Sequence, residues 1–182
     1  MALTAVQTAF YDTFQALYPG QLADYGTNTL NDRVRNYRIE SGAGDAYVIP
    51  GRFLVKGTAN AQGDPVTTPY GAKGVLSSSV LADVVGILVQ NYATTADSNN
   101  QAVPVRIPTM MTVAELGSGA IVGAVVPAGV TVADGDPVYL SVSSGTIPVG
   151  ACTNASGTGL IAVTGATWYG AAAAGTVGRI KL

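Results

Sequence analysis

Hydrophobic and polar positions follow two different patterns along the chain. Near the N-terminus, apolar side chains recur at the three- and four-residue intervals of one helical face: Leu3, Val6, Phe10, Phe14 and Leu17. This spacing predicts a short helix over about residues 5–18. Pro19–Gly20 then ends the helix, because proline lacks an amide hydrogen and glycine accepts a positive φ.

From about residue 46 to Leu182 the chain consists of short Val, Ile and Ala runs separated by Gly, Pro, Asp and Ser. Such runs are typical of strands joined by turns. The expected strands are 46–49, 52–56, 74–76, 84–91, 103–107, 110–114, 121–126, 138–142, 146–149, 159–164 and 176–182. About ten short strands predict a mainly β fold, an antiparallel barrel-like or sandwich domain, because closure protects so many strand edges.

These patterns divide the chain into two parts. Residues 1–45 are predicted to be an N-terminal arm and connecting segment, within which Val34–Glu40 has strand-like composition. Residues 46–182 are predicted to be a β-barrel-like domain. The apolar stripe of the arm has two interpretations. It packs on its own domain, or it docks on a neighbouring chain, since exposed aromatic side chains commonly mark contact surfaces.

Few side chains are charged, which narrows the range of partners. Nine Lys and Arg stand against eleven Asp and Glu, a formal net charge of -2, and only 11% of the residues are charged. We therefore expect neither nucleic acid nor a membrane as a partner, because neither gains a strong Coulombic attraction. With 48% hydrophobic residues and 23 glycines, the surface must rely on small and uncharged side chains, which favours packing against neighbouring molecules.

Targeting signals and cysteine content predict a soluble chain made in the cytoplasm. The first residues lack a basic segment, and Asp12 interrupts the apolar stretch that a secretory signal needs. The longest apolar run, Val84–Val89, is far too short to span a bilayer. The single Cys152 excludes an internal disulfide and is expected to be a small buried hydrophobic residue.

Residue types that commonly carry catalysis are missing from the sequence. There is no histidine, which is the usual general base and the commonest zinc ligand. Gly117–Gly123 has one residue too many for a dinucleotide-binding fingerprint and is expected to be a strand turn. Asp134–Pro137 lacks the further oxygens and the distal glutamate of a calcium loop, so a plain turn is predicted there. We expect no catalytic residue, no metal site and no cofactor.

One basic cluster contains an interleaved aromatic side chain, and it comprises Arg33, Arg35, Tyr37 and Arg38. Such a pattern occurs on surfaces that bind single-stranded nucleic acid. Asp32 and Glu40 bracket the cluster, so a solvated or ion-paired strand face is a second interpretation. A contact between subunits is a third.

Four segments of the chain carry a family resemblance when they are taken in order. They are Tyr18–Asp24 (YPGQLAD), Ile49–Val55 (IPGRFLV), Val84–Val89 (VVGILV) and Val130–Leu140 (VTVADGDPVYL). Together they resemble the capsid cement (decoration) proteins of tailed bacteriophages, and the resemblance spans nearly the whole chain. The first eighteen residues depart from it, because they look more helical and aromatic than an extended arm would.

The resemblance implies a mainly β, barrel-like decoration domain on the outside of an icosahedral phage head, with an N-terminal arm reaching onto capsid subunits and no catalysis. Such a protein would bind across subunit seams and stabilise the expanded head. Its partners would be the major capsid protein and copies of itself, as a dimer or trimer. It would be synthesised in the host bacterial cytoplasm and reside on the outer capsid surface of the virion.

The expected contact residues combine the aromatic stripe, the start of the resemblance and the basic cluster. They are Phe10, Tyr11, Phe14, Leu17, Tyr18, Pro19, Leu22, Arg33, Arg35, Tyr37 and Arg38.

Other functions fit parts of the same pattern. Another virion structural role, such as tail tube or head-tail joining, is one alternative. A carbohydrate-binding host-attachment β module would use solvent-facing aromatic side chains, for which Trp168–Tyr169 is the candidate pair. An enzyme that used the arginine cluster and a carboxylate would need a cleft with convergent polar side chains.

Overall fold

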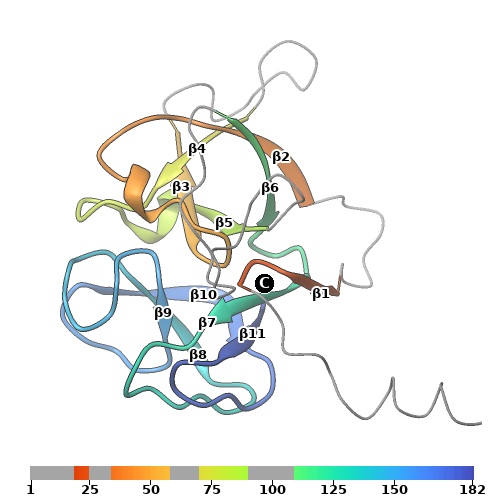
Figure 1. Ribbon diagram of the computed structural model, residues 1–182, viewed down its shortest axis with the longest axis vertical. Coiled ribbons are helices and arrows are strands. Elements are labelled where there is room, and N and C mark those ends of the chain that lie inside the picture. The colour runs from red at the N-terminus through yellow and green to blue at the C-terminus, as the bar shows by residue number, and fades with distance from the viewer. Residues whose placement is uncertain (1–18, 25–33, 58–69, 90–108) are drawn as a thin grey trace, which may run out of the picture.

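The computed structural model describes residues 19–24, 34–57, 70–89 and 109–182. Within these ranges the chain forms eleven strands and two short 3-10 helices, η1 (Asp45–Tyr47) and η2 (Leu81–Asp83). Figure 1 shows two layers, in which a small barrel is stacked on a sheet. The prediction of a mainly β, barrel-like fold is therefore confirmed.

The barrel contains five strands: β2 (Val34–Ile39), β3 (Phe53–Lys56), β4 (Tyr70–Gly74), β5 (Val84–Leu88) and β6 (Thr109–Glu115). Their order around the barrel is β2-β4-β3-β5-β6, and β6 pairs with β2 to close it. β2 and β4 run parallel, whereas the other neighbours are antiparallel. Closure leaves these five strands without an open edge.

The second layer is a six-stranded antiparallel sheet with the order β1-β7-β11-β10-β8-β9. Its strands are β1 (Leu22–Asp24), β7 (Ile121–Val125), β8 (Pro137–Ser141), β9 (Cys152–Thr153), β10 (Leu160–Trp168) and β11 (Val177–Lys181). β1 comes from the start of the chain and lies at one edge of this sheet, beside β7 (Figure 1). The N-terminal segment is thus part of the C-terminal sheet.

A single apolar cluster fills the space between the two layers. The barrel contributes Phe53 and Ile87, and the sheet contributes Leu140, Trp168 and Ile180, all of which are fully buried. Inside the barrel lies a second cluster of buried side chains: Tyr37, Ile39, Val48, Leu54, Ala72, Leu88, Met111 and Val113. Because the larger cluster draws on both layers, burial of apolar surface stabilises the barrel and the sheet together.

Two expected strands are wrong, a third, at 74–76, shares only Gly74 with a strand, and the expected boundaries of several others are only approximate. Residues 46–49 overlap η1, where the Gly42 amide donates a hydrogen bond to Asp45 Oδ1 at 2.6 Å and favours a turn. Residues 146–149 lie in bends and turns and not in a strand. The expected strand at 103–107 lies outside the described residues.

The proposed division at residues 45 and 46 stays a prediction. Val34–Ile39, which it assigned to the connecting segment, forms β2 and closes the barrel through pairing with β6. In the described parts of the chain, no helix is long and apolar enough to cross a membrane.

Candidate functional site

Residues 19–21, which we call the arm root, are hydrogen-bonded to the edge of the six-stranded sheet. Pro19 and Gly20 are buried, and the Gly20 amide donates a hydrogen bond to the Gly123 carbonyl oxygen at 2.7 Å. In return, the Gly123 amide donates to the Gln21 carbonyl oxygen at 2.9 Å. The next residue, Leu22, stands opposite Val122 and packs on the main core. The segment that precedes β1 therefore enters the domain at a fixed point.

A turn from the barrel lies directly over this root. Gly51, in the Pro50–Gly51 turn, has φ of 82°, which favours glycine. A Cβ atom at this position would lie 2.8 Å from the Gly20 nitrogen, 2.9 Å from the Gly123 oxygen and 3.0 Å from the Pro19 Cβ. The two Pro-Gly dipeptides of the sequence, Pro19–Gly20 and Pro50–Gly51, therefore meet in space across Gly123.

The residues after the turn tie it to the rest of the molecule. The Gly51 amide donates to the Leu88 carbonyl oxygen at 2.9 Å in the barrel. The guanidinium of Arg52 donates through Nη1 to the Val149 carbonyl oxygen at 3.0 Å, and burial lowers the pKa of Arg52 from its ordinary value. The Phe53 amide donates to the Gly150 carbonyl oxygen at 3.2 Å. The turn is thus held by both layers.

The basic cluster is split by the fold. Tyr37 is only 6% exposed and donates its hydroxyl to Glu115 Oε1 at 2.6 Å, at the end of β6. The Nε of Arg35 lies 3.7 Å from the same oxygen, while its side chain stays 43% exposed. Arg38 is exposed on the outer face of the barrel, opposite Met110 of β6. Arg35 and Tyr37 converge on one carboxylate, whereas Arg38 points to solvent.

The remaining predicted contact residues fall into two groups. Pro19 is buried and Leu22 half-buried against their own domain, where they hold the arm root. The others lie outside the described residues, so their part in a contact stays a prediction: Phe10, Tyr11, Phe14, Leu17, Tyr18 and Arg33.

Gly51 and Gly123 were not predicted as site residues. Gly51 falls in a segment that carries the family resemblance, and Gly117–Gly123 was expected to be a strand turn. The repeated Pro-Gly dipeptide was the available signal, but no local pattern predicts that two distant turns will touch.

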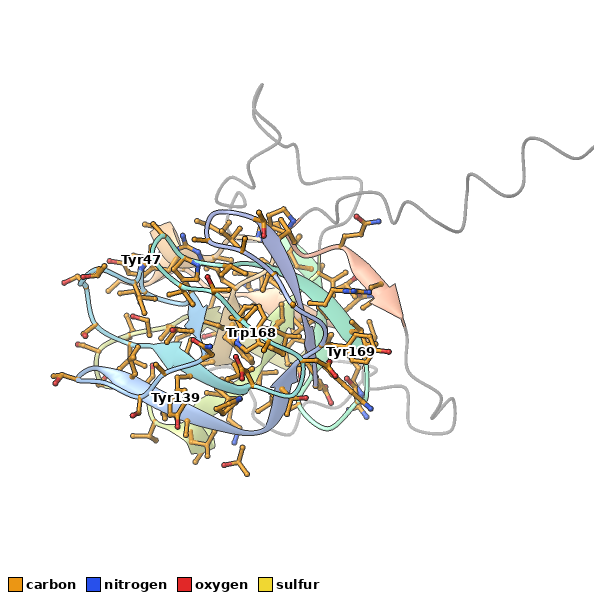
Figure 2. All side chains as sticks on the ribbon, turned by 90° about the horizontal axis from the view of Figure 1, so that it is seen from below. Tyr47, Tyr139, Trp168 and Tyr169 are labelled. Carbon is orange, nitrogen blue, oxygen red and sulfur yellow. The ribbon has the colours of Figure 1, made fainter. Side chains whose placement is uncertain are left out.

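Exposed apolar and aromatic side chains lie on the barrel and on the sheet. Met110 on β6 is 47% exposed, and Val125 on β7 is 45% exposed. Tyr169, which follows β10, is 44% exposed, and its ring centroid lies 5.5 Å from the guanidinium carbon of Arg179 on β11. Figure 2 shows Tyr169 at the periphery of the molecule and Trp168 in its interior.

The neighbouring Trp168 is not available to a sugar. It is 1% exposed, and its Nε1 donates to the Thr153 carbonyl oxygen at 3.4 Å. The pair that would have served a carbohydrate-binding module therefore offers one aromatic side chain to solvent.

The carboxylates of the Asp134–Pro137 turn accept hydrogen bonds from the protein. Asp136 Oδ2 accepts from the Ala133 amide at 2.8 Å and from Asn154 Nδ2 at 2.7 Å, and these bonds lower the pKa of Asp136 below its usual value. Asp134 Oδ1 accepts from the Gly170 amide at 2.7 Å. Among the described residues, no three metal-ligating side chains gather in one place. Burial raises the pKa of the Cys152 thiol far above its ordinary value, so it stays protonated and unreactive.

A barrel and a sheet that share one core, with an N-terminal segment fastened at the sheet edge, define the protein as a compact all-β module. A family model described as structural cement protein (E217 gp24/Pam3 gp6) matches residues 6–182. The chain therefore belongs to the phage structural cement protein family and is a structural protein of the virion. The resemblance noted from the four sequence segments is confirmed.

A solved structure shares the fold across almost the entire chain. It is a chain from the capsid of Myoviridae phage XM1, with a TM-score of 0.59 and 15% sequence identity. The alignment covers 97% of this chain and 96% of that chain. None of the curated proteins matches the sequence closely enough to count as a relative.

Proposed function

We propose that this protein binds the outer surface of an icosahedral phage capsid across subunit seams and stabilises the expanded head. The observation that carries the proposal is the match of the cement family over residues 6–182, nearly the whole chain. The fold shared with a chain of the phage XM1 capsid supports it. The proposal assigns the protein no catalytic step and no cofactor.

The arm is the first of the proposed contacts with the major capsid protein. Its apolar residues, which include Phe10 and Phe14, precede a root that is held in the sheet by Gly20 and β1. A firmly held root supports this role, because a contact made by the arm can restrain the domain only if the two stay joined. In this proposal the apolar stripe docks on a neighbouring chain.

The outer face of the barrel is the second proposed contact. Arg38 and Met110 stand opposite each other on β2 and β6, and both are exposed. Arginine and methionine are enriched at protein interfaces. With a net charge of -2, the chain must bind the shell mainly by burying apolar surface, and a single arginine adds specificity more than long-range attraction.

The proposed stabilisation follows from linkage. A protein that binds only the closed shell lowers the free energy of that shell. The stabilisation is about 2.7 kcal/mol per site when the concentration of unbound cement protein is about 100 times the Kd. A copy that touches two capsid subunits or a second copy of itself gains further from effective concentration. Modest single contacts, as a dimer or trimer, therefore suffice for a persistent outer layer.

Deletion of residues 1–18 tests the arm. We expect the shortened protein to lose attachment to undecorated capsids, measured by co-sedimentation, while it still melts in one cooperative transition. The full-length protein carrying Thr164→Ser, an exposed change on β10 of the sheet and outside both proposed contacts, is the control and should attach normally.

Two results would contradict this assignment of the arm. Normal attachment of the shortened protein would remove the arm from the contact. Loss of its cooperative melting would mean that the apolar stripe belongs to the core of its own domain.

A further inference from the structure

We propose that the Pro50–Gly51 turn is a clasp that locks the arm root onto β7 and so keeps the arm joined to the domain under load. The clasp is a property of the free protein. Only its consequence for capsid attachment rests on the proposed function.

β1 alone is a weak attachment. It is a strand of three residues at the edge of its sheet, paired on one side with β7. Its register with β7 is also irregular between Leu22 and Asp24. Short edge strands open locally at low free energy, one hydrogen bond after another. A load on the arm would therefore peel such a strand unless something held its first residues down.

The turn supplies that restraint by close approach. Gly51 faces three groups of the root and its partner strand: the Gly20 nitrogen, the Pro19 ring and the Gly123 oxygen. Even a methyl group at Gly51 would lie within 3.0 Å of all three. The Gly20 hydrogen bond to Gly123 is thereby covered on the side of the barrel, and both groups are buried.

The clasp itself is fixed on rigid parts of the molecule. The Gly51 amide is hydrogen-bonded to Leu88 of β5. Arg52 and Phe53 are hydrogen-bonded to the carbonyl oxygens of Val149 and Gly150. Phe53 is also fully buried in the shared core. Lifting the turn off the root therefore requires several hydrogen bonds to break and core contacts to separate at once.

Gly51→Ala tests the clasp against a matched control. Gly135 has φ of 81°, almost equal to the 82° of Gly51, but a Cβ there would meet nothing within 4 Å. Gly135→Ala therefore introduces the same backbone strain without the collision. The comparison isolates the close approach to the arm root.

Hydrogen exchange on the free protein gives the readout. We expect the Gly20 and Gly123 amides to exchange at least about tenfold faster in Gly51→Ala than in Gly135→Ala, while amides of the barrel strands β2 and β6 are equally protected in both. Equal rates at Gly20 and Gly123 in the two variants would overturn the proposal. If Gly51→Ala does not fold, hydrogen exchange of the Gly20 and Gly123 amides in the unsubstituted protein tests the proposal instead. Exchange of both amides at the speed of an open turn would overturn the clasp, and protection close to that of β11 would support it.

A cross-strand disulfide gives a rescue. Leu22 and Val122 stand opposite each other on β1 and β7, a placement that suits a disulfide. In a Gly51→Ala protein that also carries L22C and V122C, we expect capsid attachment to be weak when reduced and restored when oxidised. If Gly51→Ala weakened attachment only by destabilising the whole domain, a disulfide between β1 and β7 would not restore attachment.

The outcomes separate the clasp from the proposed function. An unsubstituted protein that fails to bind capsids would contradict the proposed function but leave the exchange result standing. An oxidised variant that binds no better than the reduced one, while the unsubstituted protein binds well, would overturn the clasp's role in attachment.

Discussion

At the scale of residues, the most informative contact is the meeting of Arg35 and Tyr37 at Glu115. The ion-paired strand face was one of the interpretations open for the basic cluster, and the 3.7 Å approach of Arg35 to Glu115 fits it. The sequence could not predict that Tyr37 would turn inward and donate to the same carboxylate. Glu115 lies far along the chain, and only barrel closure between β2 and β6 brings it close.

These two contacts should differ in strength. Tyr37→Phe removes a hydrogen bond between a buried hydroxyl and a carboxylate, so we expect the free energy of unfolding to fall by about 1–2 kcal/mol. Arg35→Gln removes a longer and largely solvated ion pair, and we expect a loss below about 1 kcal/mol. Urea denaturation of both variants measures the difference. A larger loss for Arg35→Gln would show that the ion pair dominates.

At the scale of elements, the strand pattern was predictable and its assembly was not. Alternation in β6 and β11 places Met111, Val113 and Ile180 inside, as period-2 patterning requires. The assignment of strands to a barrel and a separate sheet depends on pairings between distant segments. β1 with β7 is the clearest case, because no local signal links Leu22 to Val122.

The shared core predicts that the two layers unfold together. Ile87→Val, a change in barrel strand β5, should lower stability by about 0.5–1.5 kcal/mol. Trp168, the single tryptophan, lies in β10 of the sheet and reports on that layer by fluorescence. We expect its transition midpoint in urea to fall together with the midpoint from circular dichroism, while the exposed change Arg38→Gln moves neither. A shift in circular dichroism alone would mean that barrel and sheet unfold separately.

At the scale of the whole molecule, the architecture fits a protein that is fastened to a larger body. The chain combines an apolar core shared by both layers, few charges and an N-terminal segment whose root is held at a sheet edge. Composition and the four resembling segments were enough to predict the family, because the resemblance extends over nearly the whole chain. The clasp over the arm root required the fold, since it joins Gly20, Gly51 and Gly123 from three separate segments.

The most direct test of the central claim measures the stability of phage heads with and without this protein. Heads that lack it should assemble but release their DNA at a lower temperature than decorated heads, followed by the fluorescence of a DNA-binding dye. Adding purified protein should restore the release temperature in proportion to occupancy, and moderate salt should not abolish the effect, because apolar burial is screened little by ions. Undecorated heads with the same release temperature as decorated ones would contradict the proposed stabilising role.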